Sequence, residues 1–156
     1  EYLVSHPDAE YHEGCTGVWQ IPCDIALPSA TQNEIDEDSA KTLARNGCFA
    51  VAEGSNMSST PQAVEVFQSA GILYAPGKAA NAGGVATSAL EMSQNSMRYF
   101  WSFEEVDCKL RNIMTNLYRN VSSAAAEYGV PGDFVTGANV AGFLKVADSM
   151  LAYGLV

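Results

Sequence analysis

The chain contains 156 residues, 18 of them acidic and 8 basic, which gives a formal net charge of −10. It is 47% hydrophobic and 17% charged, a balance that allows a buried core and excludes a disordered tail or a low-complexity segment. The few basic residues form no patch that could follow a phosphate backbone, so we expect no nucleic-acid binding. No apolar run approaches the roughly 18 residues of a membrane helix, and the N-terminus lacks the basic segment of a signal peptide. We therefore predict a cytoplasmic protein that does not bind a membrane.

Three short apolar runs in the first half of the chain are typical of buried strands. Each is too short for a helix and is bounded by turn residues. Two helices are expected between them, because Asp36 can cap the first, and Thr60 followed by Pro61 can begin the second. Strands and helices that alternate at this spacing predict a parallel α/β sheet. The three runs are 24–27, 48–52 and 72–75.

Residues after 77 have the pattern of helices. Ser102 and Glu105 form a capping box ahead of an apolar face that continues through about five turns. A last helix, also with an apolar face, ends at Gly154. A parallel sheet of three strands is narrow, since doubly wound nucleotide domains usually have about six, and no Gly-x-Gly-x-x-Gly motif opens a helix. The chain therefore has the pattern of the second half of a larger α/β domain.

The four cysteines and two histidines do not indicate a metal site. The cysteine spacings match no C-x-x-C or zinc-knuckle pattern, and both histidines lie in one polar segment. We expect reduced thiols that are mostly buried as small apolar side chains. These six residues are Cys15, Cys23, Cys48, Cys108, His6 and His12.

The segments that follow the three predicted strands are candidates for a ligand site, because open α/β sheets bind ligands outside the carboxyl ends of their strands. All three are rich in small residues and in neutral hydrogen-bonding side chains. Small residues let a flat ligand approach the backbone, while amides and hydroxyls can bind ribose hydroxyls or a carboxamide. Ordinary turn chemistry remains an alternative explanation for these loops. The segments are 28–33, 53–56 and 76–84.

No side chain has clear features of a catalytic residue. The acidic pairs lie in the first turns of predicted helices, where the helix dipole explains them. Ser88 follows Gly83 and Gly84, which we expect to form a turn before a helix, but the sequence places no histidine nearby to activate its hydroxyl. Ser88 is better suited to donate a hydrogen bond to a bound anion.

The sequence at 75–88, continued at 90–95, closely resembles the hexameric glutamate dehydrogenases; it begins Ala-Pro-Gly-Lys-Ala-Ala-Asn-Ala-Gly-Gly. Three further blocks, at 23–34, 52–57 and 137–143, are similar to the same family and follow in the family's order. The resemblance implies an oxidoreductase that interconverts L-glutamate with 2-oxoglutarate and ammonia by hydride transfer to or from a nicotinamide cofactor. The first block is more similar to NADP-using members, so NADP is the expected cofactor, with NAD as the alternative.

The resemblance also implies roles for individual residues. Ser88 would bind the side-chain carboxylate of the substrate, with Val85 lining that pocket. Asn56 and Asn81 would hold the ribose and the carboxamide of the nicotinamide half of the cofactor. The residues whose backbone would pack near the cofactor are Ala30, Thr31 and Gln32. The residues that depart from the family's usual Ala, Pro, Thr and Gly are Ser55, Ser58, Ser59 and Ala89.

The same resemblance implies that the chain corresponds to about the last third of a longer enzyme. Residues 1–84 would form the second half of a Rossmann-like nucleotide-binding α/β domain with parallel strands, and residues 85–156 a C-terminal helical segment that completes and closes it. The family's catalytic lysines and aspartate belong to an N-terminal domain, so we expect no catalytic residue here and no activity from this chain alone. The full-length protein is expected to be a homo-hexamer.

Two other functions remain open at the level of the sequence. One is a non-catalytic nucleotide-binding or interaction module, which the sequence encoded ahead of Glu1 would distinguish from the enzyme. The other is a related amino-acid dehydrogenase with a different substrate, which a panel of amino acids tested on the full-length protein would identify.

Overall fold

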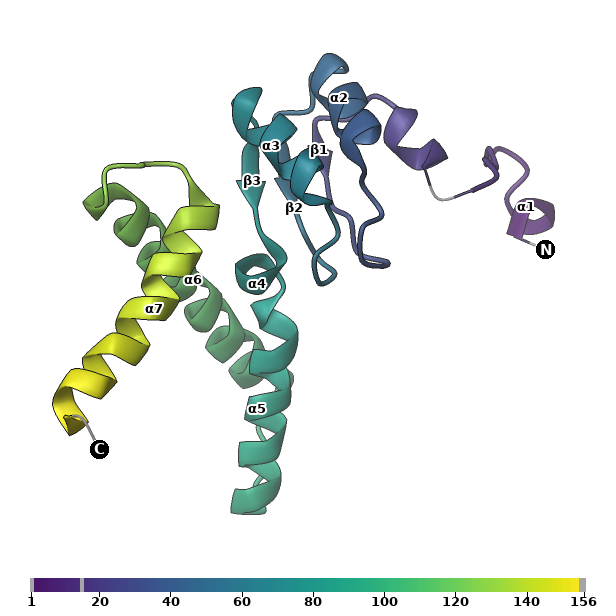
Figure 1. Ribbon diagram of the computed structural model, residues 1–156. Coiled ribbons are helices and arrows are strands. Elements are labelled where there is room, and N and C mark those ends of the chain that lie inside the picture. Colours follow the sequence, from purple (N-terminus) through teal and green to yellow (C-terminus); the bar gives the residue numbers. More distant parts are fainter. Residues whose placement is uncertain (1, 15, 155–156) are drawn as a thin grey trace.

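The computed structural model describes residues 2–14 and 16–154 of the chain. Three short strands pair in parallel, in the order β1–β2–β3. Figure 1 shows this sheet with its covering helices at one end of the molecule, and three longer helices extending away from it. The arrangement confirms the predicted α/β fold with parallel strands. The strands are β1 (Ile25–Ala26), β2 (Ala50–Ala52) and β3 (Leu73–Ala75).

The strands are shorter than the apolar runs that predicted them. Single backbone hydrogen bonds extend the pairing beyond the ends of the strands. Phe49 N donates to Asp24 O at 2.9 Å ahead of β1 and β2, and Glu53 N, just after β2, donates to Ala75 O at 3.1 Å. The extended segments therefore nearly fill the predicted runs. As a result, the loops that follow the strands lie along one edge of the sheet.

Two helices pack on one face of the sheet, and both begin where the sequence predicts. They are α2 (Glu37–Arg45) and α3 (Pro61–Ser69). The carboxylate of Asp36 accepts the Ser39 N–H at 2.8 Å, and the hydroxyl of Thr60 accepts the Ala63 N–H at 3.2 Å. Each cap satisfies a backbone donor that the first helical turn leaves without a partner.

The two faces of the sheet differ in burial. Ala26, Val51 and Tyr74 are neighbours in register, and all three lie in the main hydrophobic core. The adjacent row of side chains includes Ile25 and Leu73, which remain 51% and 52% exposed. Because parallel sheets normally have both faces covered, the second face is an apolar surface that this chain leaves open.

The prediction of a loop at 76–84, with a turn at Gly83 and Gly84, is wrong. This segment is helical except at Pro76 and Asn81. Alanine is the best helix-forming residue, and the N–H groups of Ala79 and Ala80 both donate to Pro76 O at 2.9 Å. The helices are α4 (Gly77–Ala80) and α5 (Ala82–Met97). The predicted domain boundary at residue 84 falls within the first turn of α5, and the boundary stays a prediction.

The next helix packs against position 83 at ordinary contact distance. A Cβ atom there would lie 3.5 Å from side-chain atoms of both Leu110 and Met114 in α6 (Phe103–Glu127). The glycine therefore belongs to a helix–helix contact rather than to a turn. The predicted capping box at the start of α6 is confirmed, since Ser102 N donates to the Glu105 carboxylate at 2.7 Å and Glu105 N donates to the Ser102 hydroxyl at 3.2 Å.

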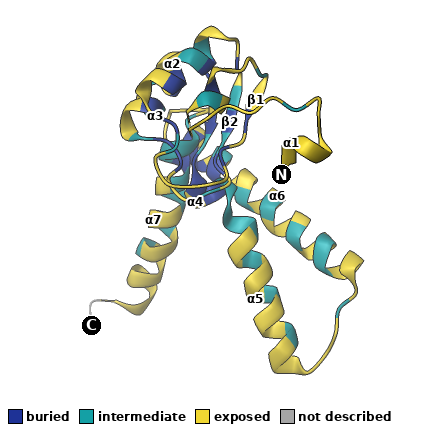
Figure 2. Cartoon of the chain, turned by 90° about the vertical axis from the view of Figure 1, so that its right-hand side faces the viewer, coloured by how far each residue is buried: buried dark blue, intermediate teal, exposed yellow. Residues whose placement is uncertain are grey.

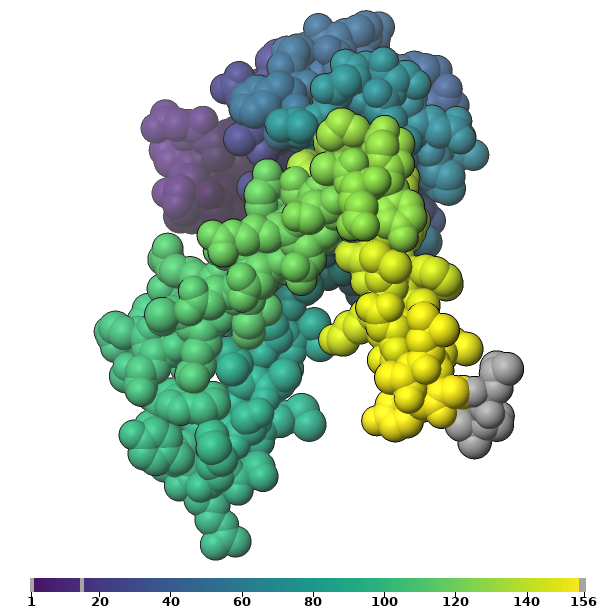
Figure 3. All heavy atoms as spheres, turned by 90° about the vertical axis from the view of Figure 1, so that its left-hand side faces the viewer, coloured from purple at the N-terminus to yellow at the C-terminus, as the bar shows by residue number. Residues whose placement is uncertain are grey.

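The last helix, α7 (Phe134–Tyr153), packs against α6 and approaches it most closely at Gly137. A Cβ atom at Gly137 would lie 2.3 Å from Val121 O, so only glycine fits at this crossing. Gly137 is the one buried residue of α7, and the predicted apolar face of the helix is largely uncovered, with Phe143 69% and Leu151 82% exposed. Figure 2 shows burial concentrated in the α/β layer, and Figure 3 shows open space between the end of α7 and the pair formed by α5 and α6.

The N-terminal region adds two short helical segments, α1 (Tyr2–Ser5) and the 3-10 helix η1 (Gly17–Gln20).

Cys48 is buried, but Cys23 is half-buried and Cys108 is exposed, so the expectation of mostly buried thiols holds only in part; Cys15 lies outside the described residues. Within 2–14 and 16–154, no cluster of three His, Cys, Asp or Glu side chains could hold a metal ion. Among the helices of the same residues, none has the length and apolarity needed to span a membrane.

Candidate functional site

A cleft of about 520 Å³ opens where the three strands end, and we call it the strand-end cleft. Six of the seven residues to which the family resemblance assigns a role line it. No charged side chain is among the lining residues, although the chain as a whole carries a net charge of −10. The lining residues are Ala30, Thr31, Gln32, Gly54, Ser55, Asn56, Asn81 and Val85.

The first wall of the cleft is the loop after β1, and it is fixed by hydrogen bonds to its neighbours. The Ala30 N–H donates to the Glu34 carboxylate at 3.0 Å, and the Asn33 N–H donates to Met57 O at 2.9 Å. Asn33 has a φ of 54°, a left-handed conformation that asparagine adopts more readily than most residues. These contacts turn the Ala30–Gln32 backbone toward the loop that follows β2.

The second wall is the loop after β2, which lies directly against the first. Gly54 N donates to Pro28 O at 2.8 Å, and a Cβ atom at Gly54 would lie 2.2 Å from the Ser29 hydroxyl. The hydroxyls of Ser55 and Ser58 are 2.5 Å apart, so one donates to the other; the Ser55 hydroxyl also lies 3.2 Å from Thr31 O, and the Ser58 hydroxyl 3.3 Å from Pro28 O. Two of the residues that depart from the family pattern thus fasten the two loops together.

The third wall carries the partner of Asn56. Asn81 lies between α4 and α5, and its Nδ2 donates to Oδ1 of Asn56 at 2.6 Å. The two side chains come from loops 25 residues apart and meet as the strand-end rule predicts. Because a carboxamide has two donor hydrogens and an oxygen with two lone pairs, the pair retains donors and acceptors for a ligand.

Glu53 is a buried residue at this site that sequence reasoning missed. It is 2% exposed, and its two carboxylate oxygens accept the N–H groups of Ser59 at 2.7 Å and Gly77 at 2.8 Å. Burial and the adjacent Glu53 carboxylate raise the pKa of the Tyr74 phenol well above its usual value. The available signal was a single acid placed directly after a buried apolar strand.

The two residues expected to bind substrate lie on α5. Val85 is 71% exposed and lines the strand-end cleft. Ser88 does not line it; it lies three residues further along the helix, and its hydroxyl donates to Gly84 O at 3.3 Å. At this spacing the two residues share one face of α5.

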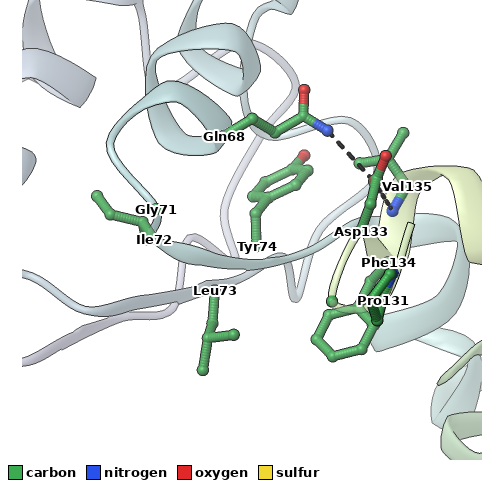
Figure 4. A pocket seen from close by; sticks show the side chains of 10 residues that line it. Gln68, Gly71, Ile72, Leu73, Tyr74, Pro131, Asp133, Phe134 and Val135 are labelled. Carbon is green, nitrogen blue, oxygen red and sulfur yellow. Dashed lines mark hydrogen bonds between the residues drawn. The ribbon is translucent and has the colours of Figure 1, made fainter. Parts of the chain in front are cut away.

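A second cavity, of about 420 Å³, lies between the α3–β3 turn and the segment before α7. Figure 4 shows Gln68 from α3 reaching Asp133, whose carboxylate accepts the Gln68 amide at 3.3 Å and the Val135 N–H at 3.0 Å. None of the residues with a predicted role lines this cavity. Its polar groups cap α7 and hold that helix to the α/β layer.

Parallel strands with a neutral polar cleft at their carboxyl ends define the chain as an open α/β protein. The family model for Glutamate/Leucine/Phenylalanine/Valine dehydrogenase matches residues 1–154. The chain therefore belongs to this dehydrogenase family.

Individual relatives agree with the family. The chain is 58% identical over 151 residues to a glutamate dehydrogenase of Bacteroides thetaiotaomicron, covering 94% of this chain and 33% of that protein. It is 56% identical over 141 residues to the NADP-specific glutamate dehydrogenase of Escherichia coli K12, covering 88% of this chain and 31% of that one. A crystal structure of Plasmodium falciparum glutamate dehydrogenase superimposes on this chain with a TM-score of 0.85 and 51% sequence identity. The superposition covers 88% of this chain and 30% of the Plasmodium chain. The chain thus spans about a third of the length of these relatives.

Proposed function

We propose that the full-length protein containing this chain is an NADP-dependent glutamate dehydrogenase, which interconverts L-glutamate with 2-oxoglutarate and ammonia. The observation that supports this most is the strand-end cleft, where residues from the loops after β1 and β2 and from the α4–α5 segment meet around the bonded pair Asn56 and Asn81. Relatives named NADP-specific glutamate dehydrogenase support NADP, and one named NAD(P)-specific keeps NAD as an alternative.

The residues of the cleft fit the nicotinamide half of such a cofactor. The residues that line the cleft present amides, hydroxyls and backbone groups, which can bind ribose hydroxyls and a carboxamide, while the nearby Glu34 carboxylate is engaged by the Ala30 N–H. When bound, the cofactor accepts or supplies the hydride. Asn56 and Asn81 would bind the ribose and the carboxamide, and the Ala30–Gln32 backbone would pack beside them.

On the substrate side, the Ser88 hydroxyl would donate to the side-chain carboxylate of glutamate, while Val85 would line the same pocket. Both residues follow Asn81 within the first turns of α5. One rigid helix would therefore set the distance between the bound substrate and the nicotinamide, as hydride transfer requires.

Several features remain proposals for the full-length protein. These are the homo-hexameric state, the cytoplasmic location and the absence of activity from the 156-residue chain alone. The comparisons do not favour a non-catalytic module. A different amino-acid substrate stays the alternative, because the family also includes leucine, phenylalanine and valine dehydrogenases.

The test is a kinetic comparison in the full-length protein of Asn81→Ala with Asn95→Ala, an exposed residue near the other end of α5. The wild type should reduce NADP with glutamate. Asn81→Ala should raise the KM for NADP about tenfold, since it removes hydrogen bonds to the cofactor, while Asn95→Ala should stay within about twofold. Activity with leucine or valine but not with glutamate would contradict the substrate, and an unchanged KM in Asn81→Ala would contradict the site.

A further inference from the structure

Glu53 is buried, although a charged side chain normally remains in contact with water. The side chain is 2% exposed, and none of the salt bridges among the described residues includes it. A buried carboxylate without a cation is strongly unfavourable unless hydrogen bonds replace its lost hydration. The contacts of its two oxygens therefore indicate why the residue is there.

Each oxygen accepts one backbone N–H, and the two donors belong to different walls of the strand-end cleft. Oε1 accepts from Ser59, at the end of the loop after β2, at 2.7 Å. Oε2 accepts from Gly77, at the start of α4, at 2.8 Å. Both distances are in the short range of charge-assisted hydrogen bonds, which are stronger than neutral ones. The carboxylate thus bridges two segments that no regular secondary structure joins.

The bridged segments are the ones that carry the asparagine pair. Asn56 lies three residues before Ser59, and Asn81 lies one helical turn after Gly77, with Asn81 N donating to Gly77 O at 3.0 Å. The segments also approach closely, because a Cβ atom at Gly77 would lie 2.7 Å from Ser55 O. Any shift of α4 away from the loop would therefore separate the two asparagines.

We propose that Glu53 is a positioning residue, whose carboxylate sets the spacing of Asn56 and Asn81 and so the affinity for the nicotinamide cofactor. This inference rests on the proposed function. Glutamine has the same size but only one acceptor oxygen, so Glu53→Gln cannot accept both N–H groups. It should release one of the two segments and so change the spacing of Asn56 and Asn81, without altering the chemistry of any side chain that would contact the cofactor.

The experiment measures NADPH dissociation constants and thermal unfolding in the full-length protein for the wild type and Glu53→Gln. The matched control is Asp133→Asn, because the Asp133 carboxylate also accepts two backbone N–H groups but caps α7, outside the strand-end cleft. Glu53→Gln should raise the dissociation constant about tenfold or more, the factor expected for one hydrogen bond to a charged group. Asp133→Asn should leave the Tm close to that of the wild type and the dissociation constant within about twofold, because both N–H groups bond to one oxygen, which asparagine retains.

The double variant Glu53→Gln with Asn81→Ala separates positioning from a general loss of stability. If Glu53 acts through Asn81, the double variant should bind NADPH no more weakly than Asn81→Ala alone. Additive losses, or a lower Tm in Glu53→Gln without weaker NADPH binding, would overturn the inference and leave the proposed function intact. Failure of the wild type to bind either NADPH or NADH would overturn both.

Gly77→Ala provides a second route should Glu53→Gln not fold. The added methyl group would press on Ser55 O and on the Glu53 carboxylate, so it should displace α4 and weaken NADPH binding in the same way. An unchanged dissociation constant in Gly77→Ala would likewise overturn the inference.

Discussion

The α/β layer buries the apolar side chains between its helices and one face of its sheet, whereas the three long helices of the same chain leave most of theirs exposed. Leu43 and Phe67 are fully buried between the sheet and its helices. In contrast, α5 has no buried residue over its 16 residues, and α7 has only Gly137. Helices gain most of their stability from packing, so the layer and the helices should respond differently to the same substitution.

The difference also separates two kinds of surface. The layer holds the strand-end cleft, whose walls are fixed by hydrogen bonds to a packed core. The helices present exposed aromatic and aliphatic side chains, and large patches of this kind mark surfaces that contact other protein. We therefore expect ligand binding to depend on the α/β layer. Contacts with other protein surfaces should depend on the long helices.

The largest expected effect compares two phenylalanines. Phe67→Ala, in the layer, should destabilise the 156-residue chain by about 3–5 kcal/mol, because it leaves a cavity in the core. Phe143→Ala, on α7, should change the free energy of unfolding by less than about 0.5 kcal/mol, because that side chain is 69% exposed. Urea unfolding followed by circular dichroism measures both, and equal losses would contradict the comparison.

Within the helices, two glycines should respond with opposite signs. Gly137→Ala should cost about 1–3 kcal/mol, because its methyl group would collide with Val121 O and force α6 and α7 apart. Gly142→Ala should stabilise α7 by about 0.5–1 kcal/mol, since nothing lies within 4 Å of that position and alanine favours the helix. Thermal unfolding of both variants tests this, and a loss in each would show that α7 is packed along its length.

The smallest expected effect is a pH dependence at the start of α2. The hydrogen bond from Ser39 N lowers the pKa of Asp36 below its usual value of 3.8. A lowered pKa in the folded state contributes stability above the unfolded pKa, and this contribution is lost as the pH falls through the folded value. Asp36→Asn keeps a capping side chain that does not titrate. The Tm advantage of the wild type should therefore be constant above about pH 5 and should shrink as the pH falls below the unfolded pKa of about 3.9, and parallel curves would contradict the assignment.

Local signals predicted much of the layer. The caps at Asp36, Thr60 and Ser102 depend on residues within one helical turn, and all three occur where expected. The rule that parallel strands end at one edge of the sheet predicted that the segments carrying Asn56 and Asn81 lie close together, as they do. These features need no knowledge of distant contacts.

The features that sequence reasoning missed depend on distant segments. Gly83 has the local pattern of a turn residue, but Leu110 and Met114 of α6 pack against it within a helix. The burial of Glu53 depends on the N–H of Gly77, 24 residues away. No short window of sequence contains both partners of either contact.

The central claim is that the strand-end cleft holds the nicotinamide half of the cofactor, and a crystal structure of the full-length protein with NADP bound tests it most directly. We expect the carboxamide and the ribose within about 2.7–3.2 Å of the side chains of Asn56 and Asn81, with the Ala30–Gln32 backbone beside them. Density for the nicotinamide outside this cleft, with the two asparagines still bonded only to each other, would contradict the account.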